Sequence, residues 1–295
     1  MMKILITGAS GLLGEKVTEL ALQQGLQVYG SHNDGPTNLE NSISLDLTDK
    51  DAVLSVSKEV KPDIIINCAG ISDVDLCERD EDLAMEVNAE APLYLAEASN
   101  TVGAHLIHVS TDYVFDGKKG MYSEDDRPNP INVYGHSKLL GEKNVASTAR
   151  SWCVARTSVL FGWGREKRPN YATWIIRGLR EEERLNVVTD QYASPTLNTN
   201  LAAMLLEVAE HKLQGTIHLA GGDRIDRFTM AIKIADVFNL DKSFLTPVGS
   251  GSVNWLARRP KDSSLNVSKV TEELDAKPMG VDKALTEMRM TENRE

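Results

Sequence analysis

A glycine-rich turn near the start of the chain limits its possible folds more than any other feature. The apolar run Ile4-Leu5-Ile6 stops at Thr7, and glycines follow at positions 8, 11 and 14. A strand that turns through glycines into a helix points backbone N–H groups at one place, beside the positive end of the helix dipole. Such a place binds phosphate, so the turn predicts the start of a dinucleotide-binding sheet. The plain alternative is a tight turn whose small residues allow close helix packing.

Further strand-like and helix-like segments follow the turn in alternation. Apolar stretches at 26–29, 42–45 and 63–67 alternate with helical patterns at 15–24 and 51–60. Three such βα units in about 70 residues predict an α/β fold, a Rossmann-like doubly wound parallel sheet. We expect residues 1–160 plus about 185–221 to form the cofactor-binding domain. Residues about 161–184 plus 222–295 are expected to form a smaller, discontinuous C-terminal substrate-binding lobe.

Composition excludes several classes of protein. The chain has 295 residues, of which 41% are hydrophobic and 25% charged, as in ordinary soluble globular proteins. The net charge of −11 disfavours binding to a nucleic acid polymer. No apolar run reaches the roughly 18 residues that span a membrane, and the N-terminal apolar run is too short for a signal peptide. We expect a cytoplasmic protein whose three cysteines form neither a zinc site nor a disulfide framework.

The end of the second predicted strand bears on the choice of cofactor. An acidic residue there hydrogen-bonds the ribose 2′-OH of NAD and repels the 2′-phosphate of NADP. Here the strand end carries Ser31 and His32, with Asp34 two residues further on and no lysine or arginine nearby. The sequence favours NADP(H) and leaves NAD(H) as the alternative.

A tyrosine and a lysine four residues apart suggest catalysis. On a helix, the Tyr134 hydroxyl and the Lys138 ammonium can reach the same atom. A nearby ammonium stabilises phenolate and lowers the tyrosine pKa, so we expect Tyr134 to be the general acid that reduces a ketone. Thr111, which follows the strand at 105–110, is expected to share the carbonyl oxygen. The alternatives are an ordinary helix-surface pair and, in place of Thr111, the neighbouring Ser110.

Several longer motifs accompany this pattern. They are Val74-Asp75-Leu76-Cys77-Glu78, Val87-Asn88, Ser110 to Gly117, Asp190 to Thr196 and Arg259-Pro260. With the glycine turn and the Tyr-x-x-x-Lys pair, the chain resembles the extended short-chain dehydrogenases/reductases and, within them, the dTDP-4-dehydrorhamnose reductases. The resemblance covers most of the chain. It implies NADP(H)-dependent reduction of a nucleotide-linked 4-keto-deoxysugar, most closely dTDP-4-dehydro-L-rhamnose.

The resemblance also implies roles for individual residues. Thr111, Tyr134 and Lys138 are implied to be catalytic. The residues implied to hold the cofactor are Gly8, Ser10, Gly11, Leu12, Asp46, Leu47, Ala69, Gly70, Tyr134 and Lys138. Ser72, Val74, Asp112 and Tyr113 are implied to face the sugar. For Asp46, the residue type alone also fits a turn or helix cap.

Two features leave the function open. Val159 stands where the family often has a tryptophan that lines the sugar pocket, which puts the identity of the sugar in doubt. The same motifs also occur in the regulatory β subunit of methionine adenosyltransferase, which keeps the fold and binds NADP but acts through a partner protein. A nucleotide-sugar epimerase or dehydratase is a further alternative.

Other expectations concern the partners of the chain. Arg258 and Arg259 are candidates to contact the substrate diphosphate, with exposed surface arginines as the alternative. We expect no metal site. A homodimer is a possible assembly.

Overall fold

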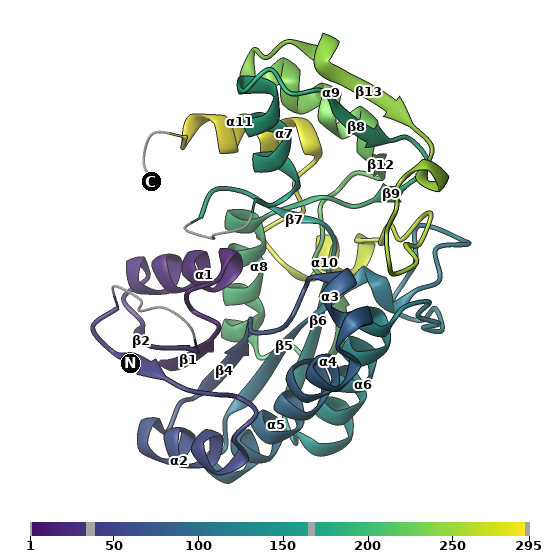
Figure 1. Cartoon of the computed structure of the whole chain (residues 1–295). Helices are drawn as coiled ribbons and strands as arrows, with labels where there is room; N and C mark the ends of the chain where they lie inside the picture. The colour runs from purple at the N-terminus through teal and green to yellow at the C-terminus, as the bar shows by residue number, and fades with distance from the viewer. Residues whose placement is uncertain (1, 34–38, 165–168, 293–295) are drawn as a thin grey trace.

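The computed structural model describes residues 2–33, 39–164 and 169–292. Asp34, considered above for cofactor choice, lies outside these ranges. Among the described residues, seven strands form one parallel sheet in the order β11-β6-β5-β4-β1-β2-β3 (Figure 1). The strands are β1 (Lys3–Thr7), β2 (Gln27–His32), β3 (Ser42–Ser44), β4 (Ile64–Asn67), β5 (His105–Thr111), β6 (Trp152–Thr157) and β11 (Gly215–His218). This confirms the predicted Rossmann-like α/β fold.

The strand order places the site. The chain runs outward from β1 through β2 to β3, and then returns to β4 on the other side of β1. The order therefore reverses between β1 and β4. In such sheets ligands bind beyond the carboxyl ends of the strands at this reversal.

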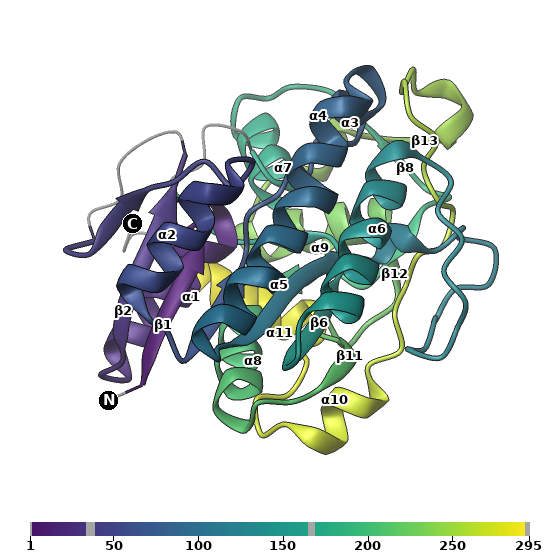
Figure 2. The ribbon, with the colours of Figure 1, turned by 90° about the horizontal axis from the view of Figure 1, so that it is seen from below.

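Helices cover both faces of the sheet (Figure 2). On one face α1 (Leu12–Gln23) and α8 (Asn198–His211) pack on Ile4, Ile66 and other apolar strand residues. On the other face lie α2 (Lys50–Val60), α5 (Ala91–Val102) and α6 (Val133–Thr148). Both faces are buried, which explains the continuous apolar runs of β1 and β4.

A second lobe lies beyond the carboxyl edge of the sheet (Figure 1). Its core joins α7 (Tyr171–Arg180), α9 (Arg227–Phe238), α11 (Val281–Met290) and β8 (Leu185–Val188). β8 pairs with β13 (Leu245–Val248) and not with the large sheet. Shorter elements in the C-terminal half include β7 (Leu160–Phe161), β9 (Tyr192–Ala193), β10 (Thr196–Leu197), β12 (Ile225–Asp226) and α10 (Ser268–Glu273). The packing of β8 favours its assignment to the second lobe.

The acidic pattern over 78–99 predicts a helix that is broken or bent near Pro92, but the structure divides the segment differently. It contains α3 (Val74–Arg79), α4 (Glu81–Met85), a π-helical turn at Glu86–Glu90 and then α5. Asp80 separates the first two helices because its side chain accepts a hydrogen bond from the Leu83 N–H and caps α4. Pro92 lies in the first turn of α5, where a proline is tolerated, and not at a break. No helix in the described part of the chain is long and apolar enough to cross a membrane.

Two buried histidines predict a loss of stability in mild acid. Burial lowers the pKa of His105 and of His218 from 6.5 to about 4. The unfolded chain therefore takes up protons that the folded chain refuses, so stability is full above pH 6.5 and falls as the pH approaches 4. The urea midpoint should fall over this range. His218→Gln should reduce the slope, whereas His136→Gln, at an exposed position of α6, should leave it unchanged; equal slopes in all three proteins would contradict the explanation.

Candidate active site

The glycine turn forms a phosphate cradle between β1 and α1. Gly8 has a φ of +68°, and the Gly11 N–H donates to its carbonyl oxygen over 3.0 Å. Gly11 occupies the N-cap position of α1 and has no side chain to cap the helix. Ser10 is exposed on the turn, and Leu12 is buried at the first position of α1. Backbone N–H groups and the helix dipole therefore meet at one place, which fits the pyrophosphate of a dinucleotide.

Gly14 lets α1 approach this turn closely. A Cβ at position 14 would lie 2.1 Å from the Gly8 carbonyl oxygen, a backbone atom that cannot move aside. Gly14→Ala should therefore weaken NADPH binding by tenfold or more and lower the melting temperature, as read by fluorescence titration and thermal unfolding. Gly249→Ala is the matched control, because Gly249 has a φ of −79° and open space around it. Equal behaviour of the two variants would contradict the role of the cradle.

The residues expected near the adenosine lie at the ends of β2 and β3. Ser31 is buried, and His32 Nδ1 is a buried atom with no hydrogen-bond partner among the residues that the structure describes. Asp46 is exposed, and its carboxylate accepts bonds from the N–H and the hydroxyl of Thr48. Leu47 is partly buried against the apolar cluster beneath the sheet. The Asp46 side chain thus stabilises a turn at this end of the sheet.

Tyr134 lies in the first turn of α6. Asn132 caps this helix, since its side chain accepts a bond from the Gly135 N–H over 2.8 Å. Thr111, at the end of β5, lies near enough to Tyr134 to lower the pKa of its hydroxyl. The rings of Tyr134 and Tyr113 meet edge to face with centroids 5.7 Å apart. The predicted convergence of β5 and α6 at one point is therefore present.

Lys138 lies one turn further along α6. Its Nζ donates to the Val109 carbonyl oxygen over 2.7 Å and lies 3.5 Å from Nε2 of His108. The side chain is 5% exposed. Burial lowers the pKa of Lys138 to about 8, against the opposing effect of the Glu142 carboxylate.

The pKa of Tyr134 moves in the direction opposite to the one expected from the sequence. Burial raises it above the usual value of 10.0, and the nearby Thr111 hydroxyl offsets only part of this effect. Burial dominates because the phenolate would be poorly solvated here. Tyr134 therefore stays protonated at neutral pH, which suits a proton donor.

The side chains of Asp112 and Tyr113, which are adjacent in the chain, lie in different surroundings. The Asp112 side chain is 2% exposed, and its carboxylate accepts bonds from the hydroxyls of Thr111, Ser158 and Ser263. Burial raises the pKa of Asp112 against these three hydrogen bonds. The carboxylate thus orients the Thr111 hydroxyl from within the protein, whereas the Tyr113 ring lies beside Tyr134.

The loop after β4 brings a third segment to the site. It carries Ala69, Gly70 and Ser72, and Val74 follows at the start of α3. Ala69 is partly buried, and Gly70 and Ser72 are exposed. A Cβ at Gly70 would lie 3.8 Å from Lys138 Nζ, so the loop backbone passes close to this lysine. A flat cofactor ring can approach such a backbone.

Asn88 is a residue of the site that the sequence analysis assigned no role. It lies in the π-helical turn and is 1% exposed. Its side chain accepts from the Ile71 N–H, donates to the Ile71 carbonyl oxygen and donates to the Ser137 hydroxyl. Asn88 thus ties the loop after β4 to α6. In the sequence, the Val87-Asn88 motif within a helical pattern was the signal that could have identified this residue.

A basic cleft of about 630 Å³ lies between the loop after β5 and the second lobe. Its cationic lining residues are Lys118, Arg224, Arg258, Arg259 and Lys261. The Arg258 carbonyl oxygen accepts a bond from the Asn132 side chain at the start of α6, and Arg259 pairs with Asp75 of α3 over 3.1 Å. The chain at Arg258 and Arg259 is therefore held beside the helix that carries Tyr134.

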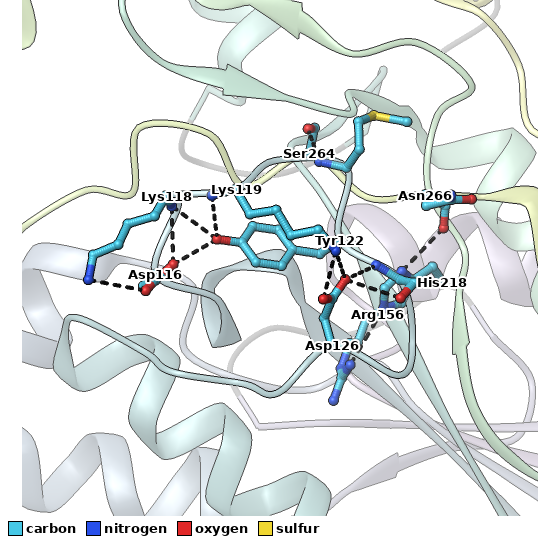
Figure 3. A network of polar contacts seen from close by, with 11 residues as sticks. Asp116, Lys118, Lys119, Tyr122, Asp126, Arg156, His218, Ser264 and Asn266 are labelled. Carbon is cyan, nitrogen blue, oxygen red and sulfur yellow. Dashed lines mark hydrogen bonds and ion pairs between the residues drawn. The ribbon is translucent and has the colours of Figure 1, made fainter.

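Tyr122 holds one wall of this cleft in place (Figure 3). Its hydroxyl accepts bonds from the backbone N–H groups of Lys118 and Lys119 and donates to the Asp116 carboxylate over 2.7 Å. Its ring stacks on Phe115, with centroids 4.2 Å apart.

Within the described residues, no group of three or more His, Cys, Asp or Glu side chains could hold a metal ion.

Comparisons with known proteins agree with this geometry. A family model described as RmlD substrate binding domain matches residues 2–293. The chain is 33% identical over 301 residues to a dTDP-4-dehydrorhamnose reductase of Aggregatibacter actinomycetemcomitans, covering 98% of this chain and 99% of that protein. It is 32% identical over 274 residues to the methionine adenosyltransferase 2 subunit beta of Danio rerio, covering 91% and 84%.

The solved structures include a similar fold with bound cofactor. A dTDP-4-dehydrorhamnose reductase (rfbD) from Bacillus anthracis in complex with NADP superposes with a TM-score of 0.89 at 32% identity, covering 98% of this chain and 99% of that one. The resemblance inferred from the motifs is confirmed. The chain belongs to the RmlD substrate binding domain family.

Proposed function

We propose that the protein is an NADP(H)-dependent reductase of a nucleotide-linked 4-keto-deoxysugar, most closely of dTDP-4-dehydro-L-rhamnose to dTDP-L-rhamnose. The observation that carries the proposal is the position of Tyr134 near Thr111 at the carboxyl edge of the sheet, with Lys138 one turn further along the same helix. The glycine cradle opens at the same edge. The reductase names of two relatives, one of them with NADP bound, support the choice of substrate and cofactor.

The side chains divide the work of the reduction. NADPH, when bound, supplies the hydride. Tyr134 gives a proton to the oxygen of the reduced carbonyl, and the Thr111 hydroxyl, which donates to Asp112 in this structure, turns to donate to that oxygen. Lys138 provides the positive charge that stabilises the phenolate left on Tyr134. Ser72, Val74 and Tyr113 are the residues of this proposal that face the sugar.

The basic cleft is the proposed place for the nucleotide diphosphate. Arg224, Arg258 and Arg259 line it, and an arginine guanidinium forms strong charge-assisted bonds with phosphate. Asp75 and Asp262 pair with Arg259 and Arg224, so these side chains are held in the cleft. In the same proposal, the domain built on the large sheet binds the cofactor and the second lobe binds the substrate.

The second candidate is a regulatory subunit that binds NADP(H) without turnover. It is favoured by the 32% identity to the methionine adenosyltransferase subunit. Such a protein keeps the cradle, but no ketone takes a proton from its Tyr134. An epimerase or dehydratase recycles a tightly bound cofactor instead of consuming NADPH.

A single assay separates these functions. Purified protein is mixed with NADPH and dTDP-4-dehydro-L-rhamnose, and the absorbance at 340 nm is followed. The reductase consumes NADPH in proportion to product. Unchanged absorbance with every 4-keto sugar nucleotide, despite NADPH binding by fluorescence, would reject the reductase and leave the regulatory subunit.

The proposal also includes a cytoplasmic location and a homodimeric assembly. All three cysteines are free thiols, which fits the reducing cytoplasm. Fractionation of cells that carry the tagged chain tests the location. Sedimentation of the purified chain tests the predicted homodimer.

A further inference from the structure

Three polar side chains form a buried row across the middle of the sheet. Thr7 of β1, Asn67 of β4 and His108 of β5 are direct neighbours in the strand register. Each is at most 1% exposed, although the neighbouring positions on these strands are apolar. The row lies at the carboxyl ends of β1 and β4, and it ends at Lys138. Buried polar groups need exact partners, so this row defines the donors and acceptors along it.

The backbone determines the orientation of the Asn67 amide. The Ala69 N–H donates to Asn67 Oδ1 over 3.1 Å, and a backbone N–H can only donate. The Thr7 hydroxyl donates to the same oxygen over 2.6 Å. Asn67 Nδ2, which can only donate, must therefore face His108 Nδ1, at 3.0 Å.

This orientation determines the state of the histidine ring. Nδ1 of His108 accepts the bond from Asn67, so it carries no proton. A neutral imidazole then has its proton on Nε2, and a charged imidazolium is disfavoured because its Nδ1–H would meet the Asn67 NH₂ group. Burial, which lowers the pKa of His108 well below 6.5, acts in the same direction. The Nε2–H points towards Lys138 Nζ, 3.5 Å away.

Lys138 therefore faces a hydrogen-bond donor. A neutral amine can accept from this N–H while it donates to the Val109 carbonyl oxygen, whereas an ammonium has no lone pair to offer. The other titratable groups that face Lys138 are Glu142 on α6, Cys68 after β4 and Cys77 on α3. Of these, Glu142 is already paired with Arg156 over 2.7 Å.

We propose that His108 is a positioning residue for the catalytic lysine: Asn67 holds its ring as the Nε2–H tautomer, and that N–H favours the neutral amine of Lys138 over the ammonium. The catalytic meaning rests on the proposed reductase function, whereas the tautomer does not. The row thereby limits the alkaline range in which Lys138 carries its charge. Thr7 is the residue at the other end of the row, and it is fully buried. The row therefore orients hydrogen-bonding groups and does not conduct protons to solvent.

The tautomer is tested directly by nitrogen NMR. Protein labelled with ¹⁵N-histidine is examined between about pH 6 and pH 9, across the usual range of histidine titration. The His108 signals are assigned by their loss in His108→Gln. We expect the Nε2–H tautomer at every pH. An Nδ1–H tautomer or an imidazolium in wild-type protein would overturn the proposal, whether or not the protein reduces any sugar.

Asn67→Asp is the variant that reverses the tautomer. The carboxylate still accepts from Thr7 and Ala69, but it now accepts from Nδ1–H of His108, so Nε2 becomes an acceptor for the Lys138 ammonium. The apparent pKa of the alkaline limb of kcat/KM, and of NADPH affinity, should rise from about 8 by about one unit or more. An unchanged limb in this folded variant contradicts the proposal.

A double variant separates the tautomer from the added charge. Asn67→Asp with His108→Phe keeps the new carboxylate but has no ring proton to move. The rise of the alkaline limb should shrink to less than half of that in Asn67→Asp alone. An equal rise in both variants would show that charge alone acts on Lys138 and would reject a role for His108.

Discussion

Replacing Tyr134 by phenylalanine is expected to lower kcat for ketone reduction by about 10²–10⁴-fold, the usual contribution of a positioned general acid. The variant lacks the only atom of this side chain that can donate a proton, and it keeps the ring that packs on Tyr113. NADPH binding should stay within about threefold of wild type, because the cradle lies on other elements. Stopped-flow absorbance at 340 nm measures the first quantity, and fluorescence titration measures the second.

Tyr113→Phe is the matched control for this variant. It removes the same hydroxyl from the neighbouring ring, whose centroid lies 5.7 Å away. Since Tyr113 is proposed to face the sugar, its loss should raise KM and change kcat by less than about tenfold. Wild-type turnover by Tyr134→Phe, or equal losses of kcat in both variants, would show that Tyr134 is not the acid.

Replacing Glu142 by glutamine is expected to destabilise the fold by about 3–5 kcal/mol, because Arg156 would be left charged and unpaired in the interior. Arg156 donates from Nε to Glu142 Oε1 over 2.9 Å and from Nη2 to Oε2 over 2.7 Å. Both side chains are at most 7% exposed. The Ser110 hydroxyl also donates to Glu142, and Arg156 lies beside His218 (Figure 3). Urea denaturation measures the loss.

Two further variants test whether burial of the charge is the cause. Lys242→Met breaks an exposed pair with Asp236 and should cost less than about 1 kcal/mol. Glu142→Leu combined with Arg156→Met removes both charges and should recover most of the stability lost in Glu142→Gln. A double variant as unstable as the single one would indicate that Glu142 acts through packing alone.

Glu142 also connects the stability of α6 to the two residues of that helix that are proposed to be catalytic. Tyr134, Lys138 and Glu142 are spaced by four residues and share one face of the helix. The bond from Glu142 to β6 fixes the rotation of that face over β5. Loss of the pair is therefore expected to disturb Lys138 as well as stability.

Local patterns were sufficient for the frame of the molecule. A strand–glycine–helix pattern leaves few conformations open, which is why the residues 4–14 predicted the cradle. Buried parallel strands appear in a sequence as short segments rich in apolar residues. β1, β4 and β5 could therefore be found from the local sequence pattern alone. The helical spacing of Tyr134 and Lys138 likewise required no tertiary information.

Other features depend on which segments meet across the chain. The sequence analysis placed Asp112 at the sugar, but its carboxylate turns inward because hydroxyls from residues 158 and 263 supply its hydrogen bonds. Residues 78–99 form several elements because an aspartate cap at position 80 competes with continuous helix, a choice that helical periodicity alone does not reveal.

By itself, the sequence determined the α/β frame, the glycine turn and the placement of Tyr134 and Lys138 on one helix face, since each rests on contacts within a few residues or on a strict spacing. Only the tertiary structure decided the protonation of the site. The pKa of Tyr134 is raised and that of Lys138 is lowered by burial, and the state of His108 depends on Asn67, 41 residues away. Desolvation and hydrogen-bond direction arise from groups brought together by folding, so no local pattern encodes them.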